Sequence, residues 1–201
     1  DVYKRQTGSS LWWTGGSYQK MQIQALLDFL RKPRYEIDPD PSLRTLGILL
    51  KWDLAVSLFF GMLVGIVGNF GPWNPDSHLF DVLFEKYSPI LILIYVVVIV
   101  PVIEELIFRG PMWYFRNSRF FGFIFYTLTL AFALVHLGNY SNLSEVWPIT
   151  LLLISPQFFG GLILGFVRVR FGLIWSIGFH MAYNAILVIP ILIIYSLGVQ
   201  L

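Results

Sequence analysis

Residues 95–110 read Tyr95-Val-Val-Val-Ile-Val-Pro-Val-Ile-Glu-Glu-Leu-Ile-Phe-Arg-Gly110, a hydrophobic run that contains two adjacent glutamates. Ionisable groups inside such a run are costly to place in a membrane, so they indicate a functional site. Two other hydrophobic runs each contain one histidine, His136 and His180. The sequence therefore predicts a buried polar site shared between membrane helices.

The overall composition is that of a membrane protein. Hydrophobic residues make up 56% of the chain and charged residues 13%, which lies outside the usual range of soluble domains. The absence of cysteine excludes disulfides, thiolate nucleophiles and cysteine metal ligands. The net charge of +2 is spread unevenly along the chain, and no nucleic-acid partner is expected.

Five hydrophobic runs follow one another, at residues 46–68, 90–115, 120–137, 147–167 and 173–201. A helix needs about 20 residues to cross the hydrocarbon core. We therefore predict an all-α, polytopic transmembrane bundle of five or six spans. Pro190 divides the last run, which is either one kinked helix or a span followed by a short segment. Pro101, Pro148 and Pro156 predict kinks or helix boundaries.

The first 44 residues are polar and basic, and we treat residues 1–44 and the transmembrane domain, residues 45–201, as separate regions. Residues 21–30 have an amphipathic pattern, which indicates either an interfacial helix or the remnant of an upstream helix. The chain begins at Asp1 without an initiator methionine, and we expect an N-terminally truncated chain.

The distribution of positive charge predicts the orientation in the membrane. Every lysine and arginine except Lys86 lies on one side of the predicted spans or close to it. Because such residues avoid short translocated loops, the N-terminal region is predicted to be cytoplasmic. The short loops suit a bacterial inner membrane.

Spacing along the helices predicts which polar groups meet. Counting about 1.5 Å per residue from the cytoplasmic arginines places Glu104, His136 and His180 within about 10 Å of one another in depth. Glu105 and Arg109 have the i, i+4 spacing of a favourable ion pair. We assign that pair to structure, which leaves Glu104 as the carboxylate that is free for chemistry.

Three motifs lie on separate hydrophobic runs. They are Glu-Glu-x-x-x-Arg at residues 104–109, Phe-x-x-x-His at residues 132–136 and His-x-x-x-Asn at residues 180–184. Together and in this order they resemble the signature motifs of the CPBP family of intramembrane proteases, also called the CAAX prenyl protease or Abi family. The resemblance covers the chain from about residue 90 to the C-terminus.

The resemblance implies an intramembrane endopeptidase, in which Glu104 acts as general base on a water molecule. His136 would hold that water or share the proton, and His180 and Asn184 would stabilise the oxyanion. Glu105 and Arg109 would fix the helix that carries the base. The family is often labelled metalloprotease, and Glu104, His136 and His180 are three potential zinc ligands. The sequence lacks a His-Glu-x-x-His helix, so we favour a mechanism without a metal or other cofactor.

The implied substrate is a peptide or membrane protein, including lipidated ones. The alternative is a non-enzymatic membrane protein, such as a bacteriocin self-immunity factor, a transporter or a scaffold, in which the same polar groups bind or conduct. A single buried polar residue can also simply join helices. A peptidase requires Glu104, His136, His180 and Asn184 to converge on one water-sized space, whereas a scaffold would leave them pointing to separate neighbours.

Three further features have simpler expected roles. Phe132 is expected to pack and to line the cavity. Lys51 and Asp53 lie near the start of the first span, where a surface lysine or a local ion pair is the default expectation. The motifs Gly-x-x-x-Gly at residues 61–65 and 161–165 permit close helix packing.

Overall fold

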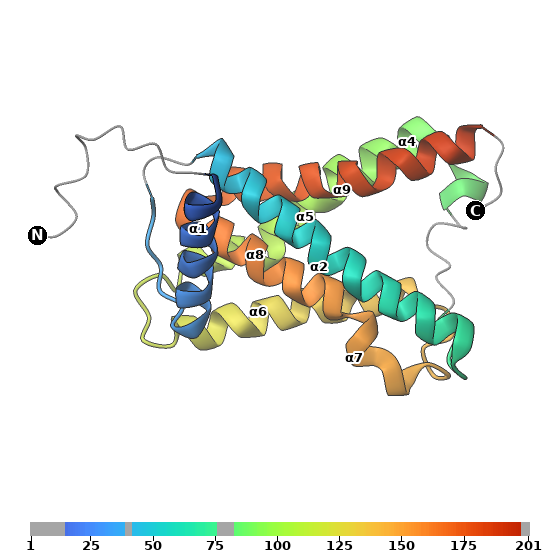
Figure 1. Cartoon of the computed structure of the whole chain (residues 1–201), viewed down its shortest axis with the longest axis horizontal. Helices are drawn as coiled ribbons and strands as arrows, with labels where there is room; N and C mark the ends of the chain where they lie inside the picture. Colours follow the sequence, from blue (N-terminus) through green and yellow to red (C-terminus); the bar gives the residue numbers. More distant parts are fainter. Residues whose placement is uncertain (1–14, 39–41, 76–82, 198–201) are drawn as a thin grey trace, which may run out of the picture.

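The computed structural model describes residues 15–38, 42–75 and 83–197, which form helices with no strand among them (Figure 1). The predicted all-α fold is confirmed. Within these residues, five helical segments are long and apolar enough to cross a membrane, so the chain is an integral membrane protein. The predicted features of residues 1–14 and the last four residues of the fifth run lie outside the described residues.

The five segments agree closely with the predicted runs. They are α2 (Leu43–Phe70), Pro89–Trp113 with α4 (Pro89–Ile94) and α5 (Val100–Phe108), Phe121–Asn139 with α6 (Phe121–Val135), Trp147–Phe171 with α7 (Thr150–Leu153) and α8 (Ser155–Phe171), and α9 (Leu173–Ser196). Gly172, between α8 and α9, has a φ of 96°, which glycine adopts without strain.

Helix α8 is the centre of the bundle, and it packs against α2, α6 and α9 (Figure 1). All its residues from Gly160 to Val169 are buried. The outer helices instead expose large apolar side chains, such as Leu58, Phe59 and Met62 on α2. Helices at the surface of a soluble protein expose mainly polar side chains, so this apolar outer surface suits a bundle that is surrounded by lipid.

Of the four prolines for which a kink or boundary was predicted, three mark helix boundaries. Pro101 lies in the first turn of α5, directly after the π-helical turn Tyr95–Ile99, and Pro156 lies in the first turn of α8. Pro148 lies in the short 3-10 turn Trp147–Ile149, directly before α7. Pro190 lies inside α9, which continues to Ser196, so this run forms one helix among the described residues.

The predicted amphipathic segment is part of a longer helix, α1 (Gly15–Arg31), which packs on α2 and α8. The hydroxyl of Tyr126 on α6 donates to the carbonyl of Leu30 at the end of α1. Arg168 Nη1 on α8 donates to the Tyr35 hydroxyl at 2.8 Å. The end of α1 and the segment after it are therefore tied to one end of the bundle. The domain boundary at residue 44 and the cytoplasmic orientation of this end stay predictions.

The two glycine motifs differ in what surrounds them. A Cβ added at Gly165 would lie 2.5 Å from Phe125 Cε2, and one at Gly161 would lie 3.1 Å from the Phe132 ring. A Cβ at Gly61 or Gly65 would meet nothing within 4 Å. Only the α8 motif therefore permits a close approach between helices in the described residues.

Replacing Gly165 with alanine should destabilise the fold by about 1–3 kcal/mol, because the added methyl overpacks the contact with Phe125. Phe125 is fully buried and cannot swing outwards. Thermal unfolding in detergent, followed by circular dichroism, measures the effect. Gly65→Ala is the matched control, and it should leave the unfolding temperature unchanged or raise it slightly, since alanine is the better helix former. Equal shifts in the two variants would contradict the packing argument.

Candidate active site

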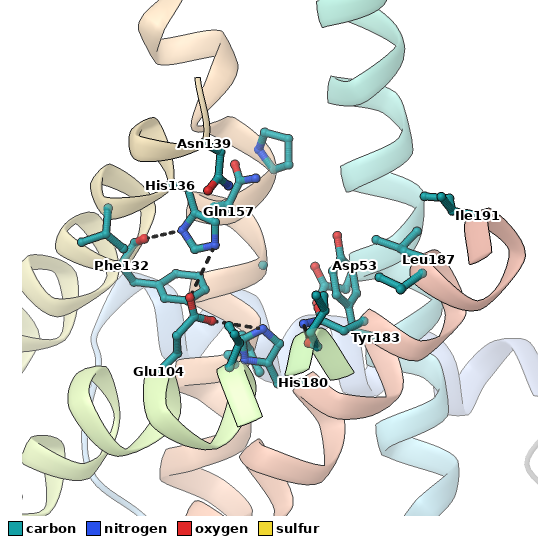
Figure 2. A pocket seen from close by; sticks show the side chains of 18 residues that line it. Asp53, Glu104, Phe132, His136, Asn139, Gln157, His180, Tyr183, Leu187 and Ile191 are labelled. Atoms are coloured by element: carbon teal, nitrogen blue, oxygen red, sulfur yellow. Dashed lines mark hydrogen bonds and ion pairs between the residues drawn. The ribbon is translucent and has the colours of Figure 1, made fainter. Parts of the chain in front are cut away.

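Glu104, His136 and His180 meet at one point although three different helices supply them. Glu104 Oε1 lies 3.8 Å from His136 Nε2, and Glu104 Oε2 lies 3.6 Å from His180 Nε2 (Figure 2). Glu104 comes from α5, His136 from the end of α6 and His180 from α9. The convergence required of a peptidase is present for these three residues.

The end of α6 orients His136. Here the helix tightens into the 3-10 turn His136–Asn139, and the His136 backbone N–H bonds to Ala133 and Leu134 instead of Phe132. The freed Phe132 carbonyl accepts a hydrogen bond from His136 Nδ1 at 2.8 Å. A carbonyl can only accept, so Nδ1 carries a proton and Nε2 is the nitrogen directed at Glu104. The motif Phe-x-x-x-His is thus a local clamp on the imidazole.

His180 is oriented by Glu105. Its Nδ1 lies 3.2 Å from Glu105 Oε1, and Ser176 Oγ, one helical turn earlier on α9, donates to Glu105 Oε2. The His180 side chain therefore lies between two carboxylates, with Nδ1 towards Glu105 and Nε2 towards Glu104. Because Glu105 holds His180 in place, this carboxylate does more than fix its own helix.

The predicted ion pair between Glu105 and Arg109 is present and fully buried, with Nη1 and Oε1 3.3 Å apart. Arg109 Nη2 donates to the Gly161 carbonyl at 3.4 Å, and the guanidinium carbon lies 3.9 Å from the centre of the Phe132 ring. That ring also contacts His136, with ring centres 4.8 Å apart. Phe132 therefore separates the buried arginine from the imidazole of His136.

Asn184 is tied to the π-helical turn before α5. In that turn the Val100 N–H bonds to Tyr95, and Pro101 has no N–H, so the Val96 carbonyl lacks its usual helical partner. Asn184 Nδ2 donates to this carbonyl at 2.9 Å. The bond uses one of the two amide hydrogens. Asn184 also lines the same cavity as Glu104.

A cavity of about 460 Å³ contains the site. Its lining includes Glu104, Phe132, His136, His180 and Asn184, together with Asp53, Gln157 and Tyr183, which the motifs do not contain. In Figure 2, Asp53 and Tyr183 lie on the opposite side from Glu104 and His136.

The default expectation for Asp53 is wrong. Asp53 is 2% exposed and lines the cavity instead of lying at the surface beside Lys51. Asp53 lies near the start of the predicted span, which suggested a place near the membrane surface. In the structure α2 begins at Leu43, so Asp53 is ten residues into the helix. Ser176, which bonds to Glu105, was not predicted as a site residue. Its i, i+4 spacing from His180 puts both side chains on one face of the helix and could have indicated it.

The side chains of Glu104, His136 and His180 are of the types that zinc takes as ligands. Among the described residues, no group of three His, Cys, Asp or Glu side chains is placed to hold a metal ion, and this trio is no exception.

The described structure is thus a helical membrane protein in which a carboxylate and two oriented imidazoles face one cavity. A family model described as type II CAAX prenyl endopeptidase, Rce1-like, matches residues 86–186, about half of the chain, and the chain belongs to this family. The match contains all three motifs. Membership supports a CAAX-type intramembrane protease in general. Comparisons with curated proteins and with solved structures gave no match.

Proposed function

We propose that the protein hydrolyses peptide bonds with a water molecule activated by Glu104. The observation that carries the proposal is the arrangement of one carboxylate and two imidazoles around one point. The Glu104 carboxylate faces Nε2 of both histidines at 3.6 and 3.8 Å, and each histidine is held through its other nitrogen. These distances are longer than direct hydrogen bonds, and a water molecule that lies beside the pairs can contact the carboxylate and an imidazole at once.

The roles of the two histidines differ because their partners differ. His136 Nδ1 donates to a neutral carbonyl, so its Nε2 has a lone pair that can accept a proton of the water. His180 lies between two carboxylates, so a protonated His180 would have compensating charge on both sides. We assign the water to Glu104 and His136, and we assign the developing oxyanion to His180 Nε2–H.

The reaction then follows general-base hydrolysis. Glu104 removes a proton as the water oxygen attacks the scissile carbonyl carbon, and the resulting oxyanion accepts hydrogen bonds from His180 Nε2–H and from the second amide hydrogen of Asn184. Collapse of the intermediate breaks the C–N bond, and Glu104 returns the proton to the leaving nitrogen. The products are a carboxylic acid and an amine.

The proposed substrate is a peptide or a membrane protein, with or without an attached lipid, that reaches the cavity within the bilayer. The wall of the cavity combines polar groups with apolar side chains from α9, including Leu187, Val188 and Ile191. This mixture suits a peptide that carries both backbone amides and apolar groups. The proposed location is a bacterial inner membrane with the α1 end in the cytoplasm.

Hydrolysis by purified wild-type protein in liposomes, with a panel of quenched fluorogenic peptides, tests this function. We expect cleavage that persists after extensive treatment with a metal chelator, because the proposed steps use only side chains of the chain itself. Mass spectrometry of the products identifies the cleaved bond. Activity that is lost on chelation and restored by zinc would contradict the metal-free mechanism, and no cleavage of any peptide would contradict the proposed function.

A further inference from the structure

Two residues in the wall of the cavity, Asp53 on α2 and Gln157 on α8, have buried acceptors. Asp53 Oδ1 and Gln157 Oε1 are both inaccessible to solvent, and neither has a hydrogen-bond partner among the described residues. In Figure 2, Asp53 lies across from Glu104, whereas Gln157 lies beside His136 and Asn139. Buried polar groups are nearly always hydrogen-bonded in folded proteins, so an unpaired carboxylate in the wall of a cavity indicates a group that a ligand satisfies.

The backbone of α8 brings Asp53 this close. Gly160 has no side chain, and a Cβ added there would lie 3.1 Å from Asp53 Oδ1. On the next residue, a Cβ added to Gly161 would lie 3.2 Å from Arg109 Nη2. The two consecutive glycines therefore admit a carboxylate on one side of α8 and a guanidinium on the other. Arg109 forms its ion pair with Glu105, and its interaction with Asp53 is only a longer-range electrostatic attraction.

The charge of the cavity favours a cation. Asp53 and Glu104 line it, whereas no lysine or arginine is among the described residues that do. An unpaired carboxylate in a poorly solvated site is costly, and a positively charged donor compensates it best. A neutral amide N–H would satisfy the hydrogen bond but would leave the negative charge of the Asp53 carboxylate uncompensated.

We propose that Asp53 forms a specificity subsite that binds a lysine or arginine side chain of the substrate next to the scissile bond. The subsite lies across the cavity from Glu104 (Figure 2), so a basic side chain held there would leave the adjacent peptide carbonyl free to reach the water at Glu104. The Asp53 carboxylate accepts hydrogen bonds from the cation. This proposal rests on the proposed function and adds a preference to it.

Matched peptides test the subsite in the wild-type protein. In each pair, arginine at one position flanking the scissile bond is replaced by citrulline, which has nearly the same shape and no charge. We expect kcat/KM to be at least about tenfold higher for the arginine peptide at one position, because the citrulline peptide leaves Asp53 without a counter-charge. Equal rates for both members of every pair would overturn the proposal without any variant.

The variant Asp53→Asn should bring the ratio of the two kcat/KM values close to one. The control is Asp28→Asn, which makes the same change in an exposed pair with Arg31 on α1 and should keep the wild-type ratio. A wild-type ratio in Asp53→Asn would overturn the proposal. If Asp53→Asn does not fold, inhibition of the wild type by n-butylguanidinium but not by n-butylurea is the expected result, and equal inhibition by both would overturn it.

Binding measured without cleavage separates this inference from the proposed function. Fluorescence anisotropy of the same labelled peptides is followed with Glu104→Gln and with the double variant Glu104→Gln, Asp53→Asn. A preference for arginine that disappears in the double variant supports the subsite even if the wild type cleaves nothing. Cleavage that shows no charge preference would leave the proposed hydrolysis standing and overturn the subsite.

Discussion

Replacing Glu104 with glutamine is expected to lower kcat for peptide hydrolysis by about 10²–10⁴-fold, the usual contribution of a general base. The amide has nearly the same shape as the carboxylate but cannot take a proton from the water. Glu104 is partly exposed to the cavity and has no ion pair with Arg109, so the fold should tolerate the change. Initial rates with a fluorogenic peptide in liposomes give the ratio.

The matched control for this experiment is Glu36→Gln. Glu36 is an exposed glutamate that pairs with Arg170 at 3.4 Å, far along the chain from the motifs. The Glu36→Gln variant should keep wild-type activity, and this result would show that removing one carboxylate does not by itself impair the protein. Wild-type activity in Glu104→Gln would remove Glu104 as the base and with it the proposed mechanism.

Replacing Arg109 with methionine is expected to cost about 3–5 kcal/mol of stability, because it leaves the Glu105 carboxylate buried without its cation. Both side chains of this pair are 0% exposed, so water cannot replace the lost partner. Methionine also loses the hydrogen bond to the Gly161 carbonyl and the contact with the Phe132 ring. Unfolding by heat and by denaturant in detergent measures the loss.

An exposed pair of the same type provides the comparison. Asp28 and Arg31 on α1 are 3.1 Å apart, and their side chains are 58% and 72% exposed. Arg31→Met should cost less than about 1 kcal/mol, as expected for a surface ion pair. If the two substitutions cost the same, burial does not set the value of the Glu105–Arg109 pair, and the structural role assigned to it would be wrong.

The sequence predicted the spans and the convergence of the site for reasons that are local to each helix. Hydrophobic length defines the five segments, and i, i+4 spacing pairs Glu105 with Arg109. Separating the roles of the two adjacent glutamates followed from that spacing alone. The structure places Glu104 against the histidines and Glu105 against Arg109.

What the sequence did not predict depends on contacts between helices. The bond between Glu105 and His180 joins α5 to α9, and the exposure of Asp53 to the cavity depends on how α2 lies against Gly160. Spacing within one helix carries no information about either contact. Asn184 is a mixed case, because its place beside the site was predicted but its bond to the Val96 carbonyl arises from an irregular turn that hydrophobicity does not reveal.

The π-helical turn Tyr95–Ile99 determines the direction in which the side chains of α5 point. A π-helical turn contains one residue more than the α-helix needs, so α5 is rotated by about 100° relative to an uninterrupted continuation of α4. Regular α-helical winding of the same residues would turn Ile103 to the direction that Glu104 takes, and Glu104 to the direction of Glu105. The one extra residue in this short valine tract therefore decides that a carboxylate, and not an apolar side chain, is presented for chemistry.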